Sequence, residues 1–178
     1  QAGAALEHFL EVNRTAPDLP GLRLELASAY LRLGRVQDAL KESQAAIAAN
    51  PKDIRTYDIL GLTYATMREY DKALSTLSRG LELDGGSTRT HLAKAQVHEM
   101  QGDVEQAEKE VRAAVQADPK TLTPHLALIQ LLMRRNQWDA AVQAGQAALA
   151  VDANAPAVHN LIGSSYQGKK DTQRAEEE

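Results

Sequence analysis

Three histidines at equal intervals are the first residues in this sequence that could do chemistry. His91, His125 and His159 are evenly spaced along the chain. Equivalent positions in stacked helical units lie about 10 Å or more apart, because packed helices are about 8–10 Å apart. The ligands of one zinc ion, however, all lie about 2 Å from it. His98 is no better placed, since seven residues of helix separate it from His91 by roughly 10 Å. We therefore predict structural histidines and no metal site.

Other catalytic arrangements are not found in the sequence. There are no cysteines, so thiolate metal sites, disulfides and cysteine nucleophiles are excluded. We find no Ser-His-Asp arrangement, phosphate-binding loop or dinucleotide fingerprint. Carboxylate runs such as Glu105, Glu108 and Glu110, or Glu176 to Glu178, are typical of solvated helix faces. The sequence therefore predicts a protein that is not an enzyme and needs no cofactor.

The composition is that of a folded, mildly acidic protein. Hydrophobic residues make up 43% and charged residues 25%, with a net charge of -4, which is too apolar for disorder. No basic surplus or spare aromatic platform indicates a nucleic-acid partner. No apolar run long enough to span a bilayer indicates direct membrane insertion. The chain begins at Gln1 without a methionine, so we interpret it as an excised piece. Its targeting segment would lie elsewhere, and bacterial cytoplasm and periplasm both stay open.

The sequence repeats itself with a fixed period of about 34 residues, and a period of this length is the signature of a repeat array. The stretch from Gly34 to Pro51 shares its skeleton with the stretch from Gly102 to Pro119, two periods later. Steps of one period from Ala39 always reach alanine, at Ala5, Ala73, Ala107, Ala141 and Ala175. We call positions that lie whole periods apart a column. The column of Pro51 also has a helix-terminating residue at Pro17, Gly85 and Pro119.

This pattern resembles the tetratricopeptide repeat, a helix-turn-helix unit with the motif W-x-x-L-G-x-x-Y, followed by A, F, A and P. The Leu-Gly or Leu-Ala pair is present as Leu26-Ala27 and Leu60-Gly61, and the tyrosine column includes Tyr30, Tyr64 and Tyr166. The tryptophan column departs most from the motif, since it reads Arg23, Tyr57, His91, His125 and His159. The resemblance covers the whole chain. It implies an all-α fold, an α-solenoid that coils into a right-handed superhelix.

The resemblance also implies where each unit begins and ends. The second half of a repeat (1–19) comes first, four whole repeats (20–53, 54–87, 88–121 and 122–155) follow, and a truncated repeat (156–178) is last. A single unit is too short to bury enough apolar surface to fold alone, so neighbouring helix pairs must stack. We expect N-caps at Asp53, Ser87 and Thr121. The last unit stops within its second helix, which predicts fraying or self-association at that end.

In this family the first helix of each repeat contributes to a continuous inner groove. The resemblance therefore implies a partner-binding set on three consecutive first helices: Arg55, Asp58, Leu62, Arg89, Leu92, Gln96, Leu126, Gln130 and Met133. Apolar side chains suit the anchors of a peptide, amides suit its backbone, and Arg55 or Arg89 suits an acidic group. We expect Leu92 and Leu126 to be exposed enough to tolerate glutamate. The family's chaperone-tail carboxylate clamp is excluded, because its lysine, asparagine and arginine pattern is not present.

These observations predict a non-catalytic scaffold that binds a peptide or a partner protein in its groove. The Ala- and Gln-rich style resembles bacterial arrays used in envelope assembly, including polysaccharide export, pilus biogenesis and exosortase-associated systems. Two alternatives stay open. One is a substrate-recruiting or regulatory region of a larger enzyme, and the other is a homo-oligomeric assembly scaffold.

Overall fold

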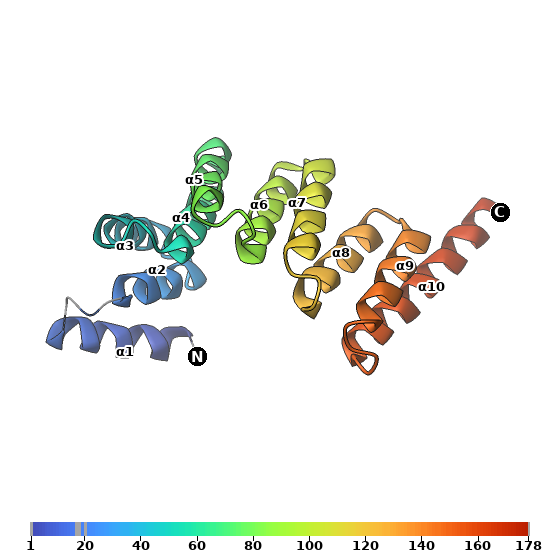
Figure 1. Ribbon diagram of the computed structural model, residues 1–178, viewed down its shortest axis with the longest axis horizontal. Helices are drawn as coiled ribbons and strands as arrows, with labels where there is room; N and C mark the ends of the chain where they lie inside the picture. Colours follow the sequence, from blue (N-terminus) through green and yellow to red (C-terminus); the bar gives the residue numbers. More distant parts are fainter. Residues whose placement is uncertain (1, 17–18, 20, 178) are drawn as a thin grey trace.

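The computed structural model describes residues 2–16, 19 and 21–177, and the side chains of residues 3–16, 19 and 21–170. The described residues form ten α-helices and no strand. The helices are α1 Ala2–Thr15, α2 Leu22–Arg32, α3 Val36–Ala49, α4 Ile54–Thr66, α5 Tyr70–Leu83, α6 Thr88–Gln101, α7 Val104–Ala117, α8 Leu122–Arg134, α9 Trp138–Leu149 and α10 Pro156–Glu177. They follow one another along an elongated array whose termini lie far apart (Figure 1). The predicted all-α solenoid is confirmed.

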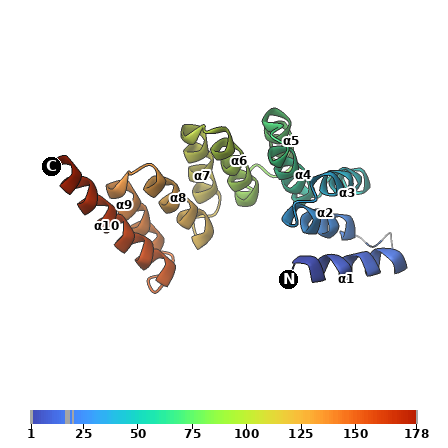
Figure 2. The same cartoon turned by 180° about the vertical axis from the view of Figure 1, so that it is seen from behind.

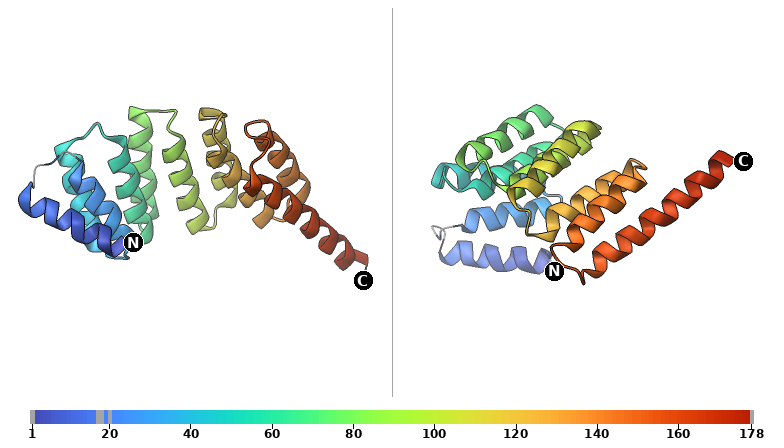
Figure 3. Two further views of the ribbon diagram at one scale, coloured as in Figure 1. Left: turned by 90° about the horizontal axis from the view of Figure 1, so that it is seen from below. Right: turned by 45° about the vertical axis from the view of Figure 1, so that its right-hand side comes forward.

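Four helix pairs share one arrangement, in which α2 packs on α3, α4 on α5, α6 on α7 and α8 on α9 (Figure 2). The first helix of each pair also contacts the first helix of the next pair. The second helices of neighbouring pairs make no such contact within the described part of the chain. The first helices are therefore the inner layer of a curved array, and the second helices are its outer layer. The views in Figure 3 show this array from two other sides.

The alanine column lies where the two helices of a pair meet. Ala39, Ala73, Ala107 and Ala141 are all 0% exposed. The space is narrow, because a Cβ atom added to Gly61 of α4 would lie 3.3 Å from the carbonyl oxygen of Ala73 on α5. Ala5 differs from the others and is exposed, since no described helix covers that face of α1. Ala175 lies outside the described side chains.

At the same contact, residues of two further columns face each other, and a small residue in one allows a large residue in the other. The small-residue column of the first helix and the aromatic column of the second helix pair as Ala27 with Ser43, Gly61 with Leu77, Ala95 with Val111 and Ile129 with Gly145. A Cβ atom on Gly61 would lie 2.6 Å from Cγ of Leu77, so the glycine makes room for the leucine. At the last pair the glycine is on the second helix, where a Cβ atom on Gly145 would lie 2.5 Å from Cγ1 of Ile162 on α10 but 3.9 Å from Cδ1 of Ile129 on α8. Gly61 thus makes room for a large residue of its own pair, and Gly145 makes room for one of the next repeat.

The turns inside the four pairs are alike. The backbone N–H of the residue before each second helix bonds the carbonyl oxygen of the tyrosine column, at 2.9 Å from Glu69 to Tyr64 and 3.0 Å from Gln137 to Leu132. The preceding residue is left-handed in every case, with φ of 72° at Gly34, 62° at Arg68, 82° at Gly102 and 56° at Asn136. This is the ordinary glycine-type end of a helix. Arg68 is the member of the column that departs from it.

Two expectations about helix ends are wrong. Residues 156–177 form the single helix α10, so the second helix expected in the truncated repeat is not formed. No packed partner imposes a turn at this point within the described residues. Thr121 is extended at the start of α8 but makes no side-chain cap hydrogen bond, whereas Asp53 and Ser87 accept bonds from Arg55 and Thr90 as expected.

We expect Ala73→Leu to destabilise the protein by about 1–3 kcal/mol, because a larger side chain must push apart two helices that are in contact. Ala5→Leu is the matched control in the same column, and its exposed position should accept the change with little effect. Denaturant unfolding of both variants measures the difference. Equal midpoints for the two would show that the column does not fix the distance between the paired helices.

Candidate partner-binding groove

The predicted partner-binding residues lie on three adjoining helices of the inner layer. Arg55, Asp58 and Leu62 are on α4, Arg89, Leu92 and Gln96 are on α6, and Leu126, Gln130 and Met133 are on α8. α4 contacts α6, and α6 contacts α8. The structure therefore brings the nine residues onto one continuous layer, but their exposures differ.

The apolar members are anchored in the core. Leu92, Leu126 and Met133 are half-buried against the cluster that contains Leu128 and Ile129. Leu62 packs in the same way against a second cluster, around Ala65 and Leu77. Part of each side chain still reaches the surface, so these residues can offer apolar contact to a partner. Because Leu92 and Leu126 also pack against the core, we now expect glutamate at either position to destabilise the protein, unlike the sequence-based expectation.

The amides and the guanidinium groups form the accessible part of the layer. Gln96, Gln130, Arg55 and Arg89 are all exposed. Both amide groups carry hydrogen-bond donors and an acceptor, which suits the backbone of a bound segment. Exposed amides beside half-buried leucines give this surface a mixed polar and apolar character.

Asp58 does not reach the surface, which corrects its predicted role as a direct contact. It is 1% exposed, and its Oδ1 accepts a hydrogen bond of 2.7 Å from Oγ1 of Thr90. Its Oδ2 lies 3.2 Å from Nε of Arg89 but has no hydrogen bond among the described residues. Burial raises the pKa of Asp58, and the Thr90 hydrogen bond and the charge of Arg89 oppose that rise. The buried carboxylate of Asp58 therefore lies under the exposed side chain of Arg89 and helps to position it.

Arg55 is held by the residue that caps its own helix. Its Nε and Nη2 atoms donate to the two carboxylate oxygens of Asp53, at 3.0 Å and 2.7 Å. This bidentate contact lowers the pKa of Asp53, and the nearby charge of Arg89 lowers it further. Arg55 and Arg89, from consecutive repeats, are thus each in contact with a carboxylate. The sequence alone did not identify Asp53 and Thr90 as their supports.

The histidine column has a structural task that its spacing did not reveal. Nε2 of His125 lies 3.1 Å from the carbonyl oxygen of Pro119, and Nε2 of His159 lies 3.0 Å from that of Ala153. The hydroxyl of Tyr57 donates to Pro51 at 2.9 Å in the same way. Each of these side chains ties the start of a first helix to the preceding inter-repeat turn. Among the described residues, no group of three or more histidine, aspartate or glutamate side chains could hold a metal ion.

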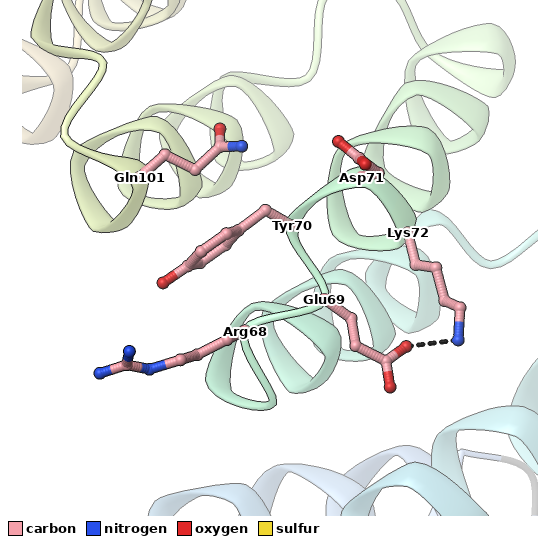
Figure 4. A pocket seen from close by; sticks show the side chains of 6 residues that line it. All are labelled: Arg68, Glu69, Tyr70, Asp71, Lys72 and Gln101. Atoms are coloured by element: carbon pink, nitrogen blue, oxygen red, sulfur yellow. Dashed lines mark ion pairs between the residues drawn. The ribbon is translucent and has the colours of Figure 1, made fainter.

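Two open pockets lie away from the half-buried residues Leu92, Leu126 and Met133. One, of about 310 Å³, is lined by Phe9 and Val12 of α1, by the start of α2, and by Arg55. The other, of about 420 Å³, is lined by residues 68–72 and by Gln101 (Figure 4). The second pocket was not predicted from the sequence. The sequence feature that could have indicated it is Arg68, at a turn position that holds glycine or asparagine in the other three helix pairs.

No helix among the described residues combines the length and apolar character needed to cross a membrane.

Known proteins resemble this chain along most of its length. A family model described as "Tetratricopeptide repeat" matches residues 1–61 and 64–122. Hsp70-Hsp90 organizing protein 2 of Arabidopsis thaliana is 31% identical over 80 residues, which are 45% of this chain and 14% of that protein. Tetratricopeptide repeat protein 8 of Caenorhabditis elegans is 31% identical over 98 residues, or 55% of this chain and 19% of that protein. The chain thus spans less than a fifth of the length of these curated relatives.

Solved structures share the fold. A thermophilic TPR protein of Thermus thermophilus superimposes with a TM-score of 0.79 at 22% identity, covering 93% of this chain and 91% of that one. MamA superimposes with a TM-score of 0.62 at 18% identity, covering 85% and 88%. YrrB, described as a TPR protein with an unusual peptide-binding site, gives 0.57 at 15% identity, covering 93% and 86%.

The buried carboxylate predicts a pH-dependent effect of Asp58→Asn. Because the pKa of Asp58 is raised above 3.8, the folded state holds its proton more tightly than the unfolded chain. The contribution of Asp58 to stability therefore falls as pH rises from the ordinary value toward the raised one. Asparagine cannot ionise, so the stability of the variant relative to wild type should be greater at about pH 7 than at about pH 4.

Denaturant unfolding of both proteins at the two pH values measures this difference. Asp71→Asn, which replaces an exposed carboxylate on α5, is the control for general charge effects. A relative stability of Asp58→Asn that is the same at both pH values would contradict the prediction.

Proposed function

Because this chain belongs to the tetratricopeptide repeat family, we propose that it is a non-catalytic protein–protein interaction scaffold that binds a peptide or a partner protein in the groove of its inner layer. The observation that carries the proposal is the pairing of exposed amides with half-buried leucines on α6 and α8. A bound segment would place apolar side chains against Leu92, Leu126 and Met133. Gln96 and Gln130 would bond its backbone.

The two guanidinium groups are paired with carboxylates but keep further N–H donors that an acidic group of a partner can accept from. Arg55 and Arg89 are exposed, and each is oriented by a carboxylate that is itself largely buried. A positioned guanidinium group binds a carboxylate with less loss of side-chain entropy than a free one. The proposed partner therefore carries an acidic residue next to its apolar anchors.

Two kinds of similar protein support this reading. The Arabidopsis relative is named as an organizer of Hsp70 and Hsp90, and YrrB is described as having a peptide-binding site. The first name concerns the organisation of two other proteins, and the second description concerns peptide binding. A place in bacterial envelope assembly is a narrower form of the same proposal, whereas a substrate-recruiting or regulatory region of a larger enzyme is an alternative to it.

The groove is tested with a peptide that is selected against the full chain from a random display library. We expect Gln96→Ala with Gln130→Ala to weaken binding of this peptide roughly tenfold, because two hydrogen bonds of about 0.5–1.5 kcal/mol each are lost. The double variant Gln116→Ala with Gln146→Ala removes two exposed amides from the outer helices α7 and α9 and is the matched control. Equal affinities of the two variants for the peptide would show that the peptide does not bind on the inner layer.

A second candidate function, self-association, is favoured by the exposed face of α10. Tyr166 is 49% exposed, although Leu132 in the same column is 1% exposed. A Cβ atom added to Gly163 would meet nothing within 4 Å. This face has the small and aromatic residues that form a helix contact in the other repeats, and a second copy would cover it.

We expect Tyr166→Ser to lower the mass measured by light scattering at high protein concentration, because it removes the largest exposed apolar group of this face. Leu83→Ser is the control, since Leu83 is 47% exposed at the end of α5. A wild-type protein that stays monomeric at every concentration would exclude this candidate and leave the groove proposal untouched.

A further inference from the structure

The pocket at the turn between α4 and α5 is separate from the groove. Residues 68–72 form one wall, and Gln101 at the end of α6 forms the other (Figure 4). None of these residues belongs to the predicted partner-binding set. The pocket lies at the edge of the array where the two helices of a pair are joined, so a ligand could occupy it while the groove is filled.

Arg68 has a backbone conformation that arginine seldom adopts. Its φ is 62°, and the residues at this position in the other three helix pairs are Gly34, Gly102 and Asn136. Left-handed backbone is unfavourable for a residue with a long side chain, and such strain tends to occur at functional sites. The turn itself does not require arginine, because the same backbone hydrogen bond forms in the three turns that have glycine or asparagine.

The side chains around the pocket offer donors that are not used within the molecule. No hydrogen bond or ion pair involves the guanidinium group of Arg68, the hydroxyl of Tyr70 or the amide of Gln101 within the described part of the chain. The ring of Tyr70 is fixed, because it packs against the core cluster of Ala73 and Leu77. Its hydroxyl and the guanidinium group of Arg68 extend to the same side of the pocket in Figure 4.

The charges near the pocket leave Arg68 free to bind an anion. The carboxylate of Glu69 is paired with Nζ of Lys72 at 2.5 Å, so the two cancel. Asp71 points away from Arg68 in Figure 4. A guanidinium group beside a phenol hydroxyl presents N–H and O–H donors to one acceptor, and a carboxylate accepts both.

We propose that this pocket binds a carboxylate group of a peptide, held by Arg68 and the hydroxyl of Tyr70, with the amide of Gln101 bonding the adjoining peptide backbone. The site gives the proposed scaffold a second point of contact, but it does not depend on binding in the groove. The carboxylate belongs either to an acidic side chain or to a chain terminus, and both have the same chemistry.

The test uses the full chain and three synthetic probes. The first is an acetylated, amidated peptide with two central glutamates, the second is its glutamine analogue, and the third is an acetylated triglycine with a free terminal carboxylate. Binding is followed by NMR through the side-chain N–H signals of Arg68 and Gln101. We expect the glutamate peptide or the triglycine to shift both signals and the glutamine analogue to shift neither. Whichever probe binds identifies the source of the carboxylate.

Variants separate binding from folding. Arg68→Gly restores the residue found elsewhere in the turn column, so it should unfold at a denaturant concentration close to that of wild type. It should nevertheless weaken binding of the active probe at least fivefold, and Tyr70→Phe should weaken it by a similar factor. Arg79→Ala, at an exposed arginine on α5, is the charge control and should bind like wild type.

Three results would overturn the proposal. These are failure of both carboxylate probes to shift the two signals, equal binding of the glutamine analogue, and unchanged affinity in Arg68→Gly. The variant Gln96→Ala with Gln130→Ala distinguishes this site from the groove, because it should bind the probes like wild type. Loss of probe binding in that variant would also count against a separate site.

Discussion

The close approach of the two helices in each pair is the constraint on which the rest of the array depends. Ala39, Ala73, Ala107 and Ala141 have no exposed surface, and any larger side chain would separate the helices that they join. Once this distance is fixed, the remaining positions only have to fill the volume left over. Gly61 with Leu77 is one solution to that requirement, which explains why the family motif varies while the alanine column does not.

Polar contacts then connect one pair to the next. Asp58 of α4 accepts a bond from Thr90 of α6, Arg134 of α8 pairs with Glu99 of α6, and Arg135 pairs with Glu105. The first of these contacts is a buried hydrogen bond and the other two are ion pairs with exposed partners, so the ion pairs add little stability, but all three are directional. We infer that they fix how successive pairs are oriented, and therefore how the inner helices present the groove. Asp58 thus takes part both in the groove, through Arg89, and in the contact between successive repeats, through Thr90.

The helix pairs could be predicted from the sequence because one small-residue column, repeated at a constant interval, has a single simple explanation. The burial of Asp58 could not be predicted, since its partner Thr90 lies on the first helix of the next repeat. Nor could the histidine column be assigned, because the carbonyl oxygens that these side chains contact come from inter-repeat turns whose geometry the sequence does not specify. Leu92 and Leu126 were placed on the correct layer, but their half-burial depends on how neighbouring repeats stack.

The turn column shows that packing, more than residue identity, decides where a helix ends. Glycine and asparagine favour the left-handed turn, yet Arg68 adopts it as well, because the contact between Gly61 and Leu77 holds α5 against α4. Lys170 occupies the same column, but no packed second helix follows it among the described residues, and α10 continues through that position. A strained residue persists only where the surrounding structure determines its conformation. The turn therefore forms whichever side chain stands there, and at Arg68 that side chain is a guanidinium group that faces the pocket.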